Sequence, residues 1–141
     1  MFSENDPKRF LVIGSNSFSG SHFVKGLIEK GFKVWGLSRS KEPNKVFLPY
    51  FWDDQEVYKI KDKCKEFNFR SLDLNNDIKE IINFIDEIQP EYIVNFAAQG
   101  MVAESWNDPV HWYKTNIISQ VSLHDELRKK KVFKEICTCH Y

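Results

Sequence analysis

The sequence predicts a three-layer α/β fold in which helices cover both faces of a parallel sheet. Short runs rich in β-branched and aromatic residues alternate along the chain with longer segments whose apolar residues recur at helical spacing. This alternation is typical of a sheet built from strand–helix–strand units. The chain has 141 residues, 42% of them hydrophobic and 15% aromatic, which suits one domain with its own core. We therefore expect residues 1–141 to form one folded unit.

The first strand–helix–strand unit is predicted at the start of the chain. Arg9–Ile13 is a compact apolar run, as expected of a buried strand. In Gly20–Lys30 four apolar residues recur at helical spacing, and Gly31 follows as a C-terminal stop. Lys33–Leu37 is the second predicted strand.

The connection from Ser38 to Lys65 has the least regular pattern. It contains Pro43, Pro49 and a run of aromatic residues, with one helix expected at Gln55–Cys64. A connection of this length is typical of a binding loop.

The second half of the chain repeats the alternation. Phe67–Leu72 is the third predicted strand, and Asp77–Ile88 is an amphipathic helix with isoleucines along one face. Tyr92–Phe96 is the fourth strand. A long helix is expected at Pro109–Lys130, because proline is accepted in a first helical turn and lysines suit the negative C-terminal end. Val132–Cys137 is the last strand.

The order of the strands follows from the handedness of their connections. Crossovers between parallel strands are right-handed, and a doubly wound sheet reverses its direction of growth after the third strand. The predicted order is therefore 3-2-1-4-5.

Composition excludes several classes of protein. Lys+Arg 20 against Asp+Glu 20 leaves no net charge, so a nucleic-acid-binding surface is not predicted. The apolar runs are far shorter than the ~20 residues that cross a bilayer, and Met1–Arg9 is polar. We expect a cytoplasmic protein with no membrane partner.

The cysteines predict no metal site. Cys64, Cys137 and Cys139 are odd in number, and the Cys-x-Cys pair lacks the second ligand pair of a zinc site. Reduced thiols are expected.

The turn between the first strand and the first helix has the sequence Gly14-Ser15-Asn16-Ser17-Phe18-Ser19-Gly20. A dinucleotide pyrophosphate rests on the helix N-terminus at such a turn. Gly14 would allow the tight turn, and Gly20 the close packing of helix on strand. Ser17 replaces the middle glycine of the dinucleotide pattern, so that its Cβ would crowd the phosphates while its hydroxyl would bond to them. Strand-to-helix turns also need glycine for structural reasons alone, which leaves both interpretations open.

The end of the second predicted strand indicates which cofactor would bind. NAD-binding units carry a carboxylate about 20 residues beyond the glycines, which binds the ribose 2′-hydroxyl. Here Ser38 stands in that position, followed by Arg39. Serine and guanidinium would bind a 2′-phosphate, which a carboxylate would repel. The pair favours NADP, with NAD as the alternative; a solvated loop arginine is the structural alternative.

Two further motifs follow the third and fourth strands, namely Asp73-Leu74 and Asn95-Phe96-Ala97-Ala98-Gln99. With the glycine turn, their order resembles the extended short-chain dehydrogenase/reductase family, whose fold is of the Rossmann type. The resemblance implies that Asp73 accepts from the adenine amino group, although Asp73 is equally suited to cap a helix. It also implies that the Ala-Ala stretch lines the nicotinamide side of the cleft.

A segment of the long helix, Tyr113-Lys114-Thr115-Asn116, is similar to the family's segment ending in Thr-Asn. The resemblance implies that Asn116 supports the site from within the helix, buried and hydrogen-bonded, as a structural asparagine would also be. The predicted cofactor contacts are thus Gly14, Ser15, Asn16, Ser17, Phe18, Ser19, Gly20, Ser38, Arg39, Asp73, Leu74, Ala97, Ala98, Gln99 and Asn116.

Within the family, Ala97-Ala98-Gln99 with Ser105 and Pro109 is most similar to the nucleotide-sugar 4,6-dehydratases and epimerases, such as the dTDP-glucose and GDP-mannose dehydratases. The segment Val34–Arg39 is similar to the NADP-using GDP-mannose dehydratases. One departure is Gly100-Met101, where many dehydratases carry Ser-His.

The end of the chain departs further from the family. Cys137-Thr138 occupies the place of a Ser-Thr step whose hydroxyl bonds to the substrate, so the resemblance implies Thr138 as the catalytic candidate. Cys139-His140 stands where dehydratases carry Asp-Glu. The family's Tyr-x-x-x-Lys pair, in which the lysine lowers the tyrosine pKa for proton transfer, is not found. We therefore expect a fragment or truncated reading frame of a longer enzyme, inactive alone.

Two hypotheses about function remain. The first is the N-terminal cofactor-binding part of an NAD(P)-dependent nucleotide-sugar dehydratase or epimerase, whose partner is a nucleotide sugar. The second is a non-catalytic NAD(P)-binding or partner-binding module, which Ser17 and the missing tyrosine–lysine pair favour. A homodimer is expected through Pro109–Lys130, which carries one apolar stripe. The resemblance implies that this helix pairs with the one that carries Tyr-x-x-x-Lys, so without that helix the stripe would be partly exposed and favour self-association. The stripe consists of Val110, Tyr113, Ile117 and Val121.

Overall fold

The computed structural model describes residues 7–44, 47–51, 67–130 and 135–138. Within them, parallel strands form a five-stranded sheet with the order β3-β2-β1-β4-β5. The predicted fold class and strand order are confirmed. The strands are β1 (Arg9–Ile13), β2 (Lys33–Ser38), β3 (Phe67–Ser71), β4 (Tyr92–Asn95) and β5 (Glu135–Thr138).

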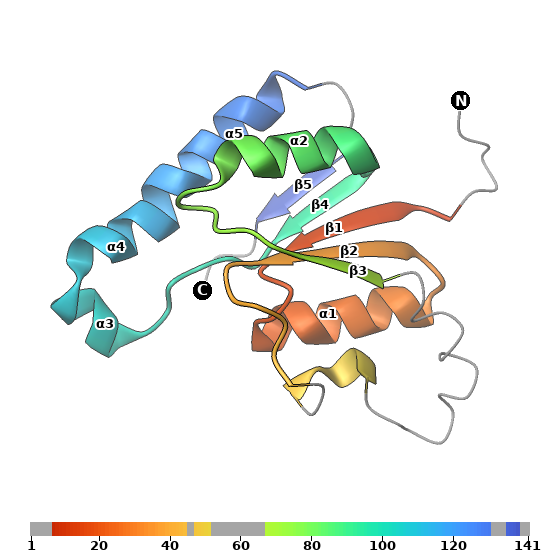
Figure 1. The fold of residues 1–141 in the computed structure, drawn as a ribbon, viewed down its shortest axis with the longest axis horizontal. Coiled ribbons are helices and arrows are strands. Elements are labelled where there is room, and N and C mark those ends of the chain that lie inside the picture. The colour runs from red at the N-terminus through yellow and green to blue at the C-terminus, as the bar shows by residue number, and fades with distance from the viewer. Residues whose placement is uncertain (1–6, 45–46, 52–66, 131–134, 139–141) are drawn as a thin grey trace.

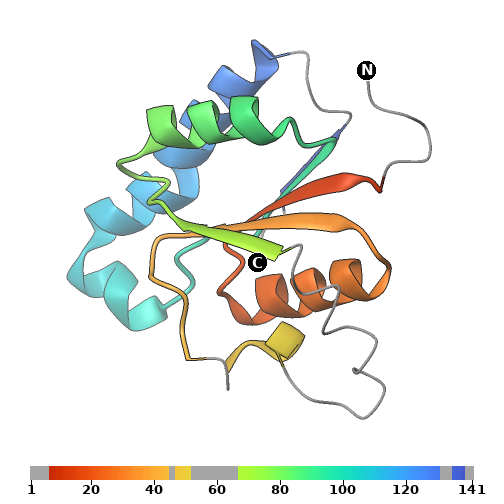
Figure 2. The same ribbon diagram turned by 45° about the vertical axis from the view of Figure 1, so that its right-hand side comes forward.

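Helices lie on both faces of this sheet, as the three-layer prediction requires. Figures 1 and 2 show α1 on one face and α2 and α5 on the other, with α3 and α4 near the carboxyl ends of the strands. The α-helices are α1 (Phe18–Glu29), α2 (Ile78–Ile88), α3 (Val102–Asn107), α4 (Pro109–Tyr113) and α5 (Ser119–Arg128). A 3₁₀ turn, η2 (Pro49–Phe51), and a π-helical turn, η5 (Lys114–Ile118), complete the described elements.

The core is divided by the sheet into two clusters. Alternate side chains of β1 point to opposite faces, so that Leu11 and Ile13 join one cluster and Val12 the other. The first cluster is completed mainly by the isoleucines of α2 and by Leu123 and Leu127 of α5. The second contains apolar residues of α1 together with Leu48 and Tyr50 from the segment that follows β2. Each face of the sheet thus buries apolar side chains against the helices that cover it.

The helix boundaries differ from the predicted ones for local reasons. Helix α1 begins at Phe18 rather than Gly20, because the Ser17 side chain caps the helix by accepting a hydrogen bond from the Gly20 amide. Gly31 adopts φ 80°, which confirms its role as the C-terminal stop. The helix expected at Gln55–Cys64 lies outside the described residues.

The long helix predicted from Pro109 is continuous in path but not regular. Its segments α4, η5 and α5 follow one another without a break, with the π turn in the middle. A π turn widens the helix by one residue and changes which side chains face inward.

Helix α3 was not predicted from the sequence. No helix in the described ranges has the length and apolar character needed to cross a membrane.

Candidate functional site

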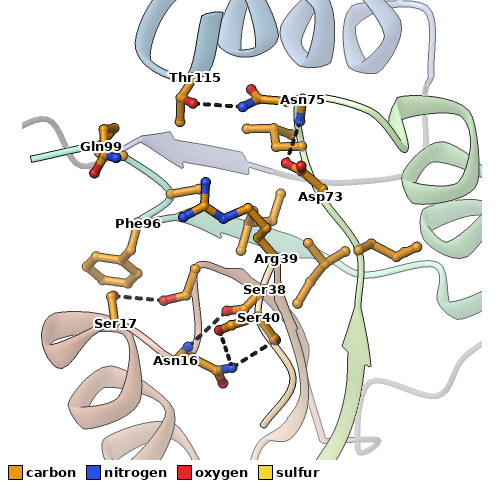
Figure 3. Close-up of a pocket in the computed structure, with 17 residues that line it drawn as sticks. Asn16, Ser17, Ser38, Arg39, Ser40, Asp73, Asn75, Phe96, Gln99 and Thr115 are labelled. Carbon is orange, nitrogen blue, oxygen red and sulfur yellow. Dashed lines mark hydrogen bonds between the residues drawn. The ribbon is translucent and has the colours of Figure 1, made fainter. Parts of the chain in front are cut away.

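A pocket of about 290 Å³ lies at the carboxyl ends of the central strands (Figure 3). In a doubly wound sheet, ligands bind at this edge, where the strand order reverses. The pocket brings together ten of the predicted cofactor contacts from four separate segments. They are Gly14, Asn16, Ser17, Ser38, Arg39, Asp73, Leu74, Ala97, Ala98 and Gln99.

The two glycines of the first turn are required by close contacts. Gly14 has φ 78°, and a Cβ there would lie 2.7 Å from the Ala97 backbone nitrogen. A Cβ on Gly20 would lie 2.2 Å from the Gly14 carbonyl oxygen. These distances confirm the tight turn at Gly14 and the close packing at Gly20. Together they bring the start of α1 against the end of β4.

Ser17 uses its hydroxyl inside the turn. Its Oγ donates to the Gly14 carbonyl over 2.8 Å and accepts from the Gly20 amide over 3.0 Å. Its φ of −70° is accessible to any L-residue, so the backbone does not require glycine at this position. The residue that replaces the middle glycine therefore stabilises the start of α1, while it also lines the pocket.

Asn16 ties the first turn to the segment after β2. Its amide nitrogen Nδ2 lies 3.3 Å from the Ser40 carbonyl and 3.2 Å from the Lys41 carbonyl, and its backbone N–H donates to Ser38 Oγ over 3.0 Å. Ser38 is buried. The Asn16 carbonyl oxygen Oδ1 is also buried, and it has no hydrogen-bond partner among the described residues. Because buried acceptors are almost always satisfied, this unpaired oxygen is unusual.

Asp73 is held in a turn at the end of β3. Its carboxylate accepts from the Asn75 backbone N–H over 2.9 Å and from the Asn76 side chain over 2.8 Å. Its own N–H donates to the Asp77 carboxylate over 2.7 Å, and Asp77, rather than Asp73, precedes α2 as the N-terminal cap residue. Asp73 thus organises its own loop and faces the pocket at the same time.

Asn116 fixes the segment that follows β4. Its Oδ1 accepts from the Gln99 backbone N–H over 2.7 Å, and its Nδ2 donates to the Gln99 carbonyl over 2.9 Å. The Gln99 side chain in turn donates to Glu104 of α3. Asn116 is hydrogen-bonded as predicted, although it is half-buried rather than buried.

A second cavity, of about 1130 Å³, adjoins the first. Both are lined by Ser17 and by residues 96–99, and the larger one extends over Asn116 and the aromatic residues of α3 and α4. The two cavities therefore form one continuous path along the carboxyl edge of the sheet.

The remaining predicted contacts lie outside these two cavities. Ser15 is fully buried beneath the turn, whereas Phe18 is 81% exposed; neither they nor Ser19 and Gly20 line either cavity. Thr138 ends β5 in register with Asn95, which places its backbone at the same edge of the sheet.

Sequence reasoning missed a polar cluster between the β3–α2 loop and the π turn. Asn75 Nδ2 donates to Thr115 Oγ1 over 2.8 Å, and Ser119 Oγ donates to Asn75 Oδ1 over 2.7 Å. Asn75 and Thr115 both line the smaller pocket and appear in Figure 3. The sequence signal that could have indicated this cluster was the Asn-Asn pair directly after Asp73-Leu74. The partner of Asn75, Thr115, lies in the π turn, and no sequence pattern indicated that turn.

The fold and the site together define a Rossmann-type domain with a nucleotide-binding edge. The strand order, the glycine turn at the start of α1, and a pocket across the switch point are the defining features of this class. A family model described as GDP-mannose 4,6 dehydratase matches residues 11–140. The chain belongs to that family, within the extended short-chain dehydrogenases/reductases.

Individual relatives agree with this membership. Protein CapI of Staphylococcus aureus is 32% identical over 82% of the chain and 32% of its own length. GDP-mannose 4,6-dehydratase of Yersinia enterocolitica is 28% identical over 86% of the chain and 31% of its own length. Among solved structures, UDP-glucose 4-epimerase of Thermus thermophilus in complex with NAD is 27% identical, with a TM-score of 0.68 over 88% of the chain and 35% of its own. The chain thus spans about a third of each of these proteins.

Proposed function

We propose that this chain is the cofactor-binding part of an NAD(P)-dependent nucleotide-sugar 4,6-dehydratase or epimerase. The observation that carries the proposal is the convergence of the glycine turn, Arg39, Asp73 and residues 97–99 on one pocket. Relatives named as dehydratases and epimerases of nucleotide sugars support the same class of substrate.

The two adjoining cavities suggest how a dinucleotide lies. Asp73 and Leu74 would hold the adenine in the smaller pocket, and the turn from Gly14 to Ser17 would hold the pyrophosphate. The nicotinamide half extends past Ala98 toward the larger cavity, where a sugar has room to bind.

NADP is the proposed cofactor. Ser38 ends β2 where NAD-binding domains carry a carboxylate, and Arg39, exposed at the pocket, supplies a cation for a 2′-phosphate. NAD is the alternative, because the Thermus thermophilus epimerase was solved with NAD.

A bound nicotinamide cofactor would supply reversible hydride transfer with a sugar carbon. This chain's contribution is to bind and orient. Asn116 holds the Gln99 backbone on both its N–H and its carbonyl, which shapes the wall between the two cavities. Thr138, at the carboxyl end of β5, is proposed to hydrogen-bond the sugar oxygen through its hydroxyl.

Two further features belong to the proposal. The stripe along α4, η5 and α5 is exposed, with Val110 75%, Ile117 44% and Val121 64% accessible, which supports a homodimer through this surface. Within the part of the chain that the structure describes, Cys137 forms no disulfide, which supports a cytoplasmic location.

The test compares dinucleotide binding by the 141-residue chain with binding by a variant that carries a larger side chain in the pocket. Ala98 is exposed and lines both cavities, so Ala98→Glu adds volume and negative charge beside the cofactor without disturbing the core. Calorimetric titration should show at least about tenfold weaker binding of NADP and NAD. The matched control, Ala103→Glu, changes an exposed alanine of α3 and should bind normally. Equal affinities of the two variants would contradict the proposed site.

A further inference from the structure

A hydrogen bond joins Arg39, which lines the smaller pocket, to His111 of α4. The Arg39 atom Nη1 lies 3.1 Å from His111 Nε2. Arg39 follows β2 and lines the pocket, whereas His111 belongs to the first turn of α4. The contact joins residues that are 72 positions apart in the sequence. Figure 3 shows the Arg39 side chain extending from the end of β2 into the pocket.

The hydrogen-bond chemistry fixes the form of the histidine ring. Arginine donates and never accepts, so His111 Nε2 accepts and the ring carries its hydrogen on Nδ1. The Asn75 nitrogen Nδ2 lies 3.4 Å from the same His111 atom, while the Asn75 oxygen accepts from Ser119. Both neighbours thus present donors to Nε2.

His111 itself is held in place by its own backbone. Its N–H donates to the Asp108 side chain over 3.0 Å, which caps α4, and its carbonyl accepts from Thr115 Oγ1 over 3.0 Å. The Thr115 hydroxyl also accepts from Asn75. The His111 backbone is therefore held on both sides, and its ring nitrogen Nε2 lies within reach of Arg39 and Asn75.

We propose that His111 is a positioning residue that holds Arg39 at the pocket for a 2′-phosphate, and so raises the preference for NADP over NAD. The inference rests on the proposed dinucleotide-binding function. A guanidinium has five N–H donors, and His111 uses one, which leaves four for phosphate oxygens. Because arginine loses rotamer freedom when it binds, an arginine already restricted at the pocket binds the phosphate more tightly.

The test measures the ratio of NAD to NADP dissociation constants of the 141-residue chain. His111→Ala should weaken NADP binding about three- to tenfold and leave NAD binding unchanged. His111→Gln should restore most of the NADP affinity, because the glutamine amide oxygen can occupy the place of Nε2 as an acceptor. The control His124→Ala removes a half-buried histidine of α5 that does not line the smaller pocket, and should change neither constant.

A double-mutant cycle separates positioning from general stability. In an Arg39→Ala background, His111→Ala should have no further effect on NADP binding. An equal effect with and without Arg39, an equal loss of NAD and NADP affinity, or failure of His111→Gln to rescue would overturn the role of His111. In each of those cases NAD binding still supports the proposed function. If wild type binds neither dinucleotide, the proposed function fails and this inference with it.

Discussion

The side-chain amide of Asn95 donates to the side-chain oxygen of Gln120 over 2.6 Å, and this bond ties the end of β4 to α5. Asn95 Oδ1 accepts from the Ala97 backbone N–H over 2.9 Å, and Gln120 Nε2 donates to the Ala97 carbonyl over 2.8 Å. Asn95 is 1% exposed and Gln120 is 7% exposed, so the network holds the pocket wall from inside the protein.

Asn95→Ala should destabilise the fold by about 1–3 kcal/mol, because it leaves the Gln120 oxygen and the Ala97 N–H buried without partners. Urea denaturation of wild type, Asn95→Ala, Gln120→Ala and the double variant measures this free energy of unfolding. The double variant should lose less than the sum of the single losses, since the two residues form one network. Additive losses would show that the pair is not coupled.

Gly14→Ala should destabilise the protein by about 2–5 kcal/mol, because the new Cβ meets the Ala97 backbone and φ 78° is strained for alanine. The matched control is Gly26→Ala in α1, where a Cβ would meet nothing within 4 Å. That change should stabilise the protein by about 0.5–1 kcal/mol, since alanine favours helix. Thermal unfolding measures the midpoint temperature of both variants. Equal midpoint temperatures for Gly14→Ala and Gly26→Ala would refute the close approach of the turn to the end of β4.

Cofactor preference depends on Arg39 in the proposed function. One charge-assisted contact to a 2′-phosphate contributes roughly 1.5–3 kcal/mol, about ten- to a hundredfold in affinity. Arg39→Ala should therefore lose most of the preference for NADP while it keeps its NAD affinity, as measured by titration with both cofactors. If wild type binds both equally, or the variant loses both equally, Arg39 is a solvated loop residue.

Self-association should depend on the exposed stripe of the α4–α5 run. Val121 is 64% exposed on α5, and Val121→Lys places a charge in the proposed contact, which should weaken association by about tenfold or more. Sedimentation velocity over a range of concentrations measures it. Val102→Lys serves as the control, because Val102 is comparably exposed, at 73%, but lies on α3. A wild-type chain that stays monomeric at high concentration would rule out this interface.

The fold could be predicted because its signals are local. Strand β1 has the predicted bounds, and the strand order follows from handedness and chain reversal. Gly14, Gly20 and Gly31 were predictable since their backbone positions exclude other residues, and the structure places each in such a contact or at such a φ. Helix α3 was missed because six residues carry too little periodicity.

Most side chains of the candidate pocket could also be named from the sequence, because parallel strands end at one edge and their following residues meet there. The hydrogen bonds that each of those side chains makes could not be predicted from the sequence. Ser17 was expected at the phosphates; it lines the pocket, and its hydroxyl also caps α1. Asp73 was expected at the adenine; it lines the pocket, and its carboxylate also organises its own loop.

The sequence by itself determined the sheet, the glycine turn and the edge at which the pocket lies, since these depend on residue spacing along one segment at a time. Only the tertiary structure decided the pairing of side chains distant in sequence. Arg39 with His111, Asn75 with Thr115, and Asn95 with Gln120 meet across separate elements. Their contacts depend on where the helical run after Pro109 lies beside the pocket and on its rotation about its own axis, and this run contains the π turn Lys114–Ile118. A hydrogen bond is lost over an ångström of displacement, so spacing along the chain could not decide them.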